Sequence, residues 1–324
     1  MARPATHPNA ATPVHPDGRD RWQARRQLAA PDRYDLAGTV GALLVGRHDP
    51  TAQLGVRDLW RACRTPDGPA TVHLRHEGTE LTATGYGPGG DWLVRRAHAL
   101  AGLHDDGGNG FAEVAARDEI VAVLARRHPG LRLPRSELVF QELLATVLQQ
   151  KVTWIEAARS YGRLVRHFGE PAPGPVPLLL PPDPAAVAAT PYWRFHPMGI
   201  EQKRADTLRR AASAAARLEE TVSMPPQDAA RRLLSIPGIG PWTVGELGRL
   251  AYGDPDAVSV GDFHLPHQVA YTLAGEPRAD DARMLELLAP FAGHRGRVLQ
   301  LIVAGGSRPP RRGPRRPHRS FAQF

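Results

Sequence analysis

A tight Pro-Gly turn between two apolar helical patterns constrains this chain more than any other feature. Residues 233–240 read LLSIPGIG, and a new helix is predicted to begin at Pro241. Glycine fits a sharp turn and lets a ligand approach the backbone closely, because it has no Cβ. The first N–H groups of the next helix lack helical partners and favour an anion. The turn at Gly238 and Gly240 is therefore either a phosphate-binding loop or a structural link between two packed helices.

The full string over residues 233–243, L-x-x-I-P-G-I-G-P-W-T, closely resembles the helix-hairpin-helix of base-excision DNA glycosylases. In that family a catalytic aspartate follows the hairpin, and Asp262 lies 20 residues after the tryptophan of this string. The resemblance implies that backbone amides at Gly238, Gly240 and Thr243 hold DNA phosphates, which sets register without reading sequence. It also implies that the partner is double-stranded DNA with damaged bases.

Asp262 lies in the segment VGDFHL, at the predicted start of another helix. Its residue type alone fits a helix N-cap, where a short carboxylate accepts N–H bonds. The resemblance implies instead that Asp262 is the catalytic carboxylate, while Asp254 and Asp256 follow the hairpin helix too closely. Such a carboxylate stabilises the positive charge that develops on the sugar and positions or deprotonates water. The nucleotide must first be flipped out of the duplex.

The residue before the hairpin threonine separates two subtypes of this family. Relatives that also cut the strand carry a lysine there, which forms a Schiff base. This chain has Trp242, as the monofunctional alkylbase glycosylases do, and its only lysines are Lys151 and Lys203. The resemblance thus implies hydrolysis without a lyase step. The Trp242 indole is expected either to stack on a flipped cationic base or to pack between the hairpin helices.

The segment LQQKVT over residues 148–153 resembles the family's junction of two helices, where one side chain replaces the extruded base. Position assigns this wedge role to Lys151, although an apolar or amide side chain is more usual there. Gln150 is the better match to the motif. The alternative for both residues is a solvated helix end.

Two positions of the expected base pocket depart from the family pattern. Glu246 stands where the best-known alkylbase enzyme has an aromatic residue, and His294-Arg295 replaces an aromatic-Arg pair. A carboxylate beside a cationic purine attracts it and accepts a hydrogen bond, or it indicates a different damaged base.

Composition fits a nucleic-acid partner. The chain has 324 residues and a formal net charge of +8, which favours polyanions. Six arginines lie within residues 308–319, which are expected to form either a solvated tail or an arm that follows DNA.

Several absences narrow the function. Cys63 is the only cysteine, which excludes a disulfide framework, a Cys-based zinc site and the iron–sulfur cluster that some of these glycosylases carry. The spacing of His264, His267 and His294 is unlike a metal-ligand set. No apolar run of about 18 residues and no apolar signal core is found. We expect a cytoplasmic, nucleoid-associated monomer without cofactor or metal.

The residue pattern predicts a mainly α protein, a multi-helix bundle preceded by a small α+β domain. Four parts are expected: a disordered segment 1–33, an α+β domain 34–110, a helical glycosylase domain 111–305 with its hairpin at 233–252, and a disordered Arg/Pro-rich tail 306–324. The α+β part resembles the TBP-like N-terminal domain of the inducible alkylbase glycosylases. In it we predict extended chain at 34–46, a β-hairpin within 71–85 and a helix at 91–103. Later helices are predicted at 139–148, 155–168, 203–218, 227–234, 241–252, 263–273, 281–288 and 295–303.

The pattern as a whole resembles the inducible 3-methyladenine DNA glycosylase II family of bacteria, over about residues 118–305. It implies a monofunctional glycosylase that releases alkylated purines in base-excision repair. One alternative is a catalytically silent module that binds DNA or senses damage, and the intact Asp262 argues against it. The other is a glycosylase for mismatched or oxidised bases. The missing cluster cysteines and hairpin lysine argue against that one.

Overall fold

The described part of the chain begins with an antiparallel sheet, and most of the helices follow it. The computed structural model describes residues 23–104 and 110–310. The strands are β1 (Gln23–Ala29), β2 (Ala52–Leu54), β3 (Asp58–Thr65), β4 (Gly68–Glu77) and β5 (Glu80–Tyr86), in the order β1-β5-β4-β3-β2. Strands β4 and β5 form the predicted hairpin, in which Glu77 pairs with Glu80 across a two-residue turn. Gly78 takes a φ of 60° in that turn, a conformation that favours glycine.

Two predictions for the N-terminal part are wrong. Residues 23–29 form edge strand β1 and pair with β5 along their whole length, so disorder does not extend to residue 33. Their polar, half-exposed pattern gave no strand signal, as is usual for a sheet edge. The stretch 34–46 is not extended, because Leu36–Val40 forms helix α1 and Gly41–Leu43 continues it as a 3-10 turn. Asp35 caps α1 by accepting the N–H of Gly38 at 2.8 Å. Residues 1–22 lie outside the described part.

Helix α2 (Gly90–Leu100), the predicted helix at 91–103, packs against β1, β4 and β5. Leu59, Leu74 and Leu81 of the sheet are fully buried in this core. Leu138 and Leu250 belong to the same cluster, although they come from the helical part. The sheet and the helices therefore share one apolar core at their junction.

The helices of the rest of the chain have these bounds: α3 (Phe111–Ala115), α4 (Glu119–Arg127), α5 (Val139–Gln149), α6 (Trp154–Phe168), α7 (Pro184–Ala189), α8 (Gln202–Ser213), α9 (Ala215–Glu219), α10 (Pro226–Leu234), α11 (Pro241–Leu250), α12 (Leu265–Ala274), α13 (Asp281–Leu288) and α14 (Arg295–Gly305). Shorter 3-10 turns lie at Tyr192–Arg194, His196–Met198, Glu220–Ser223 and Ala289–Phe291. The predicted helices are confirmed, except that 203–218 divides into α8 and α9 at Ala214.

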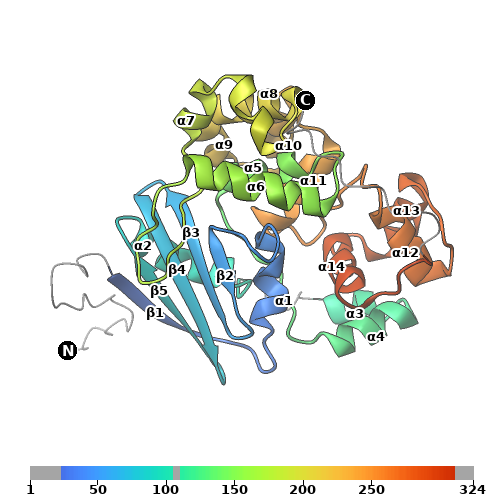
Figure 1. Ribbon diagram of the computed structural model, residues 1–324. Coiled ribbons are helices and arrows are strands. Elements are labelled where there is room, and N and C mark those ends of the chain that lie inside the picture. The colour runs from blue at the N-terminus through green and yellow to red at the C-terminus, as the bar shows by residue number, and fades with distance from the viewer. Residues whose placement is uncertain (1–22, 105–109, 311–324) are drawn as a thin grey trace, which may run out of the picture.

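The helices form two groups around separate cores (Figure 1). Helices α5 to α11 lie above the sheet in this view, and α5 is buried on every side from Val139 to Leu148. The other group, at the right, consists of α3, α4, α12, α13 and α14 around Phe111, Met284 and Phe291. The hairpin helices α10 and α11 belong to the first group and α12 to the second. The segment 251–264, which contains Asp262, connects the two groups.

A buried ion pair joins the sheet to the central helix. Arg61 of β3 donates to Glu142 of α5 at 2.6 Å, and both side chains are 2% exposed. Burial lowers the pKa of Arg61, but the adjacent Glu142 carboxylate outweighs this and leaves the pKa above its ordinary value.

The end of the chain is only partly described. Residues 306–310 form no helix, and Thr272 donates to the carbonyl of Ser307 at 3.0 Å. The rest of the predicted Arg/Pro-rich tail lies outside the described residues. Within the described ranges, none of the helices has the length and apolar character needed to cross a membrane.

Candidate active site at the hairpin

The hairpin turn joins α10 to α11. Its two glycines, Gly238 and Gly240, differ in whether the fold requires a glycine at that position. Gly238 takes a φ of +101°, and a Cβ on it would lie 2.0 Å from Oγ1 of the buried Thr207. Gly240 has a φ of −118°, and a Cβ there would meet nothing within 4 Å. The fold therefore demands glycine at 238 but not at 240. Open space at Gly240, where α11 begins without a side-chain cap, leaves the helix N–H groups accessible to a ligand.

Gln150 ties the end of α5 to this turn. Its Nε2 donates to the carbonyl of Gly238 at 3.0 Å and to Oγ1 of Thr243 at 3.1 Å. Thr243 is 1% exposed, and its side-chain oxygen faces the protein, where it accepts from Gln150. The structure thus brings together Gln150, Gly238 and Thr243, which the sequence placed in two separate motifs.

The next residue, Lys151, is exposed at the turn between α5 and α6. Its φ of +59° is left-handed, which is rare and costly for a side chain other than glycine. A capping box follows, in which Thr153 and Glu156 each bond to the other's backbone N–H at the start of α6. The turn is therefore held in a defined conformation from both sides.

Asp262 is held by both of its carboxylate oxygens. Oδ1 accepts the N–H groups of His264 at 2.7 Å and Leu265 at 2.8 Å, and Oδ2 accepts the Trp242 indole N–H at 3.0 Å. Asp262 is not the N-cap of α12, which is His264, but its Oδ1 still binds N–H groups at the start of that helix, while Oδ2 faces the hairpin helix. The hydrogen bond from Trp242 was not predicted from the sequence.

Other hydrogen bonds hold the loop that carries Asp262. The Asp281 carboxylate accepts the N–H of Gly261 at 3.1 Å, and Gly261 takes a φ of +95°. Ser259 donates to Glu246 at 2.6 Å. From the sequence, Asp281 was predicted only to begin a helix. Its contact with Gly261, 20 positions earlier, has no signal in the local sequence.

Glu246 and His294, the two residues that differ from the family's pocket pattern, both contact other residues of the protein. The Glu246 carboxylate accepts from Ser259 and from Arg249, the latter at 2.6 Å, and its side chain is 14% exposed. His294 precedes α14 and its ring lies against Phe111, with centroids 5.4 Å apart. Glu246 therefore supports the Asp262 loop in this structure.

Asp256, rejected above as the catalytic residue, fastens the same segment to α14. It accepts the backbone N–H groups of Gly293 at 2.9 Å and Arg295 at 3.0 Å, and both ends of its carboxylate bind the Arg295 guanidinium. Partial burial raises the pKa of Asp256, but the hydrogen bonds from Arg295 outweigh it, so the pKa lies below its ordinary value. The clamp joins residues on either side of α12 and α13.

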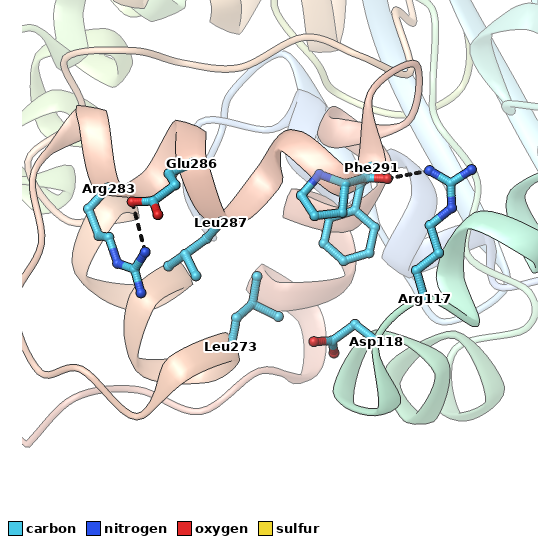
Figure 2. A pocket seen from close by; sticks show the side chains of 8 residues that line it. Arg117, Asp118, Leu273, Arg283, Glu286, Leu287 and Phe291 are labelled. Atoms are coloured by element: carbon cyan, nitrogen blue, oxygen red, sulfur yellow. Dashed lines mark hydrogen bonds and ion pairs between the residues drawn. The ribbon is translucent and has the colours of Figure 1, made fainter.

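A separate cavity of about 220 Å³ lies between α4 and helices α12 and α13, as Figure 2 shows. Its charged side chains already have partners: Arg117 donates to the carbonyl of Pro290, Asp118 caps α4, and Arg283 binds Glu286. The cavity shares no residue with the hairpin or the Asp262 loop. Among the residues that the structure describes, no three His, Cys, Asp or Glu side chains gather as metal ligands.

The curated proteins that match this chain are named as 3-methyladenine glycosylases or as DNA repair enzymes. No family model matches the chain. DNA-3-methyladenine glycosylase 2 of Escherichia coli (strain K12) is 31% identical over 144 residues, which are 43% of this chain and 50% of that protein. The chain spans between 32% and 61% of the length of the curated relatives it matches.

Solved structures share the fold over most of the chain. A 3-methyladenine DNA-glycosylase from Archaeoglobus fulgidus superposes with a TM-score of 0.74 at 16% identity, over 86% of this chain and 97% of that one. An 8-oxoguanine glycosylase/lyase from Clostridium acetobutylicum, bound to double-stranded DNA, gives a TM-score of 0.64 at 12% identity, over 84% and 91%. The fold is therefore shared by enzymes with and without lyase in their names.

Proposed function

Because this chain belongs to the helix-hairpin-helix superfamily of DNA glycosylases, we propose that it is a monofunctional glycosylase that releases alkylated purines, of the 3-methyladenine type, from double-stranded DNA. The observation that carries the proposal is the contact between Trp242 and Asp262, which fixes a carboxylate beside the hairpin. The similarity to DNA-3-methyladenine glycosylases supports the substrate class.

Asp262 is the catalytic carboxylate in this proposal. When the C1′–N bond of a flipped nucleotide breaks, its electron pair leaves with the base and positive charge develops on the sugar. A carboxylate at that place stabilises the sugar cation electrostatically. Water then bonds to C1′, and its proton passes to Asp262 or to solvent. A purine methylated on a ring nitrogen is already cationic and leaves as a neutral base, so no strong general acid is required.

The hairpin holds the DNA backbone. The backbone N–H groups of Gly238, Gly240 and Thr243 are assigned to a phosphate next to the flipped nucleotide, since a helix start favours an anion. The open space at Gly240 supports this assignment, because a phosphate needs close approach to the backbone. Gln150 keeps the hairpin in register with the turn that carries Lys151.

The absence of a lyase step is also part of the proposal. A Schiff base needs a lysine amine next to the reacting sugar. The position before Thr243 holds Trp242, whose indole N–H is bonded to Asp262. Lys203 lies on α8 and Lys151 lies at the turn before α6.

One experiment tests the enzyme and the residue together. Purified protein is incubated with duplexes that carry 3-methyladenine, 7-methylguanine or hypoxanthine, and free base and strand breaks are both measured. We expect base release from the alkylated duplexes, no strand cleavage without added base, and a loss of release in Asp262→Asn. Asp58→Asn, on the sheet, is the matched control and should keep full activity.

The outcomes separate the parts of the proposal. No release from any lesion contradicts a glycosylase. Full activity in Asp262→Asn contradicts the assignment of the carboxylate. Strand cleavage at the released site contradicts the monofunctional mechanism.

A further inference from the structure

The start of α6 presents an apolar surface that the protein does not cover. Trp154 is 50% exposed and Ile155 is 47% exposed, and they directly follow the exposed Lys151 turn. On α6, Ala157, Tyr161 and Leu164 continue the same apolar stripe and are at most 2% exposed. The stripe thus extends one turn beyond the core toward the start of α6, where Trp154 is half exposed to solvent.

This surface is continuous with the hairpin. Gln150 bonds to both Gly238 and Thr243 of the hairpin, so the turn that leads into Trp154 and Ile155 begins in contact with the hairpin. Eight large hydrophobic side chains are exposed among the described residues. Four of them fall in the α6 start, the hairpin and the Asp262 loop: Trp154, Ile155, Leu234 and Phe263. Exposed apolar side chains concentrate where the DNA is expected.

Lys151 and Trp154 lie close together in the sequence but are chemically suited to different parts of DNA. A gap in a base stack is filled by an apolar or aromatic group, and stacking on an aromatic ring does not depend on which base is present. A lysine ammonium is strongly hydrated and pairs well with phosphate, but it fills an apolar gap poorly. Lys151 is therefore chemically suited to the backbone, and Trp154 to the bases.

We propose that Trp154, supported by Ile155, is the residue that packs against the base stack at the gap left by the flipped nucleotide, while Lys151 binds a neighbouring phosphate. This inference rests on the proposed function, because it takes damaged duplex DNA as the occupant of the surface. Two features preorganise it: the capping box fixes the first turn of α6, and the buried Arg204 fixes the end of α5 by donating to the carbonyl of Leu148 at 2.9 Å.

The test measures binding to two duplexes with the full-length protein. One duplex carries a stable tetrahydrofuran abasic analogue with 2-aminopurine in the opposite strand, and the other is intact. Dissociation constants come from fluorescence anisotropy, and 2-aminopurine emission reports stacking beside the gap. The variants are Trp154→Ala, Trp154→Phe and Lys151→Ala, with Val56→Ala, 83% exposed near the sheet, as the surface control.

For Trp154→Ala we expect Kd for the abasic duplex to rise about 5- to 150-fold, the range that corresponds to one lost base–aromatic stack. Binding to the intact duplex should change much less, and Trp154→Phe should recover most of the loss. Lys151→Ala should weaken binding to both duplexes alike and reduce the salt dependence by about one phosphate contact. Val56→Ala should match the wild type.

The outcomes distinguish this inference from the function on which it rests. If Trp154→Ala binds the abasic duplex as tightly as the wild type, with unchanged 2-aminopurine emission, the inference is wrong even when base release is intact. If the Trp154 effects appear but no lesion is released, the inference stands and the enzymatic proposal fails. A wild-type protein that binds neither duplex overturns both. Circular dichroism of Trp154→Ala, and the recovery in Trp154→Phe, separate a local effect from misfolding.

Discussion

Substituting alanine at Gly238 should destabilise the protein through two causes that the structure separates. A left-handed backbone at φ +101° costs a residue with a Cβ about 1–2 kcal/mol. The new methyl would lie 2.0 Å from Oγ1 and 2.9 Å from Cγ2 of Thr207, which is fully buried and cannot move aside freely. Such overpacking costs about 1–3 kcal/mol. We therefore expect Gly238→Ala to lose about 2–5 kcal/mol, or roughly 4–20 °C in Tm.

Gly240→Ala is the matched control two residues away. Its φ of −118° is ordinary, and its Cβ meets nothing, so the free energy of unfolding should change by less than about 0.5 kcal/mol. The same variant should bind duplex DNA more weakly, because its methyl occupies the space assigned to the phosphate. Thermal and urea unfolding, followed by circular dichroism, measure the first effect, and anisotropy measures the second.

A third variant isolates the contact from the backbone strain. Thr207→Ala in the Gly238→Ala background removes the two closest atoms and leaves only Cβ of residue 207, at 3.0 Å, so the double variant should recover most of the overpacking share but not the cost of the φ angle. A Tm of Gly238→Ala within 1 °C of wild type would refute this reasoning. An equally large loss in Gly240→Ala would also refute it, since the two sites would then be equivalent.

Three further predictions concern other contacts of the protein. Trp242→Phe removes the indole N–H bond to Asp262, a hydrogen bond to a charged group worth about 1.5–3 kcal/mol, so the free energy of unfolding should fall by about that amount in urea titrations. The kcat for base release should also fall, because the Asp262 carboxylate is no longer held beside the hairpin. Glu142→Gln leaves the buried Arg61 guanidinium without its countercharge and should cost about 3–5 kcal/mol in urea unfolding, whereas an apolar pair at both positions should be much less costly. The pKa of Asp256 is lowered from 3.8, so its contribution to stability is present above that pH and is lost as the pH falls through the lowered pKa; Asp256→Asn should flatten the stability profile below pH 3.8, and an unchanged acid limb would contradict the clamp.

Local patterns were sufficient to predict most helices and the hairpin. The spacing of apolar residues located α11 and α13, because each buries one face against neighbours. The patterns failed where tertiary contacts decide the structure. Residues 36–40 form a helix only because Asp35 caps it and the sheet core covers it, and a short apolar run does not distinguish helix from strand.

In the candidate site too, local sequence patterns predicted which residues lie in one region, but not the tertiary contacts between them. The motif spacing placed Trp242 and Asp262 in one region, and the structure adds the hydrogen bond between them. Glu246 was expected to face a base, yet its carboxylate is bonded to Ser259 and Arg249. The contact of Asp281 with Gly261 joins the start of α13 to the Asp262 loop through the fold, so no sequence spacing indicates it.

The shared core at the junction has a consequence for how the molecule unfolds. The segment before α5 bonds to both parts: Arg135 N–H donates to Ala99 at the end of α2, and Ser136 N–H donates to Leu250 at the end of the hairpin helix. Leu250 itself lies in the core of the sheet. Melting the sheet would expose the last turn of α11, so the sheet and the hairpin should denature in one cooperative transition rather than as independent modules. Removing the sheet by truncation should therefore unfold the hairpin. Substitutions in the sheet core should likewise weaken DNA binding, although the sheet core is not part of the proposed DNA-binding surface.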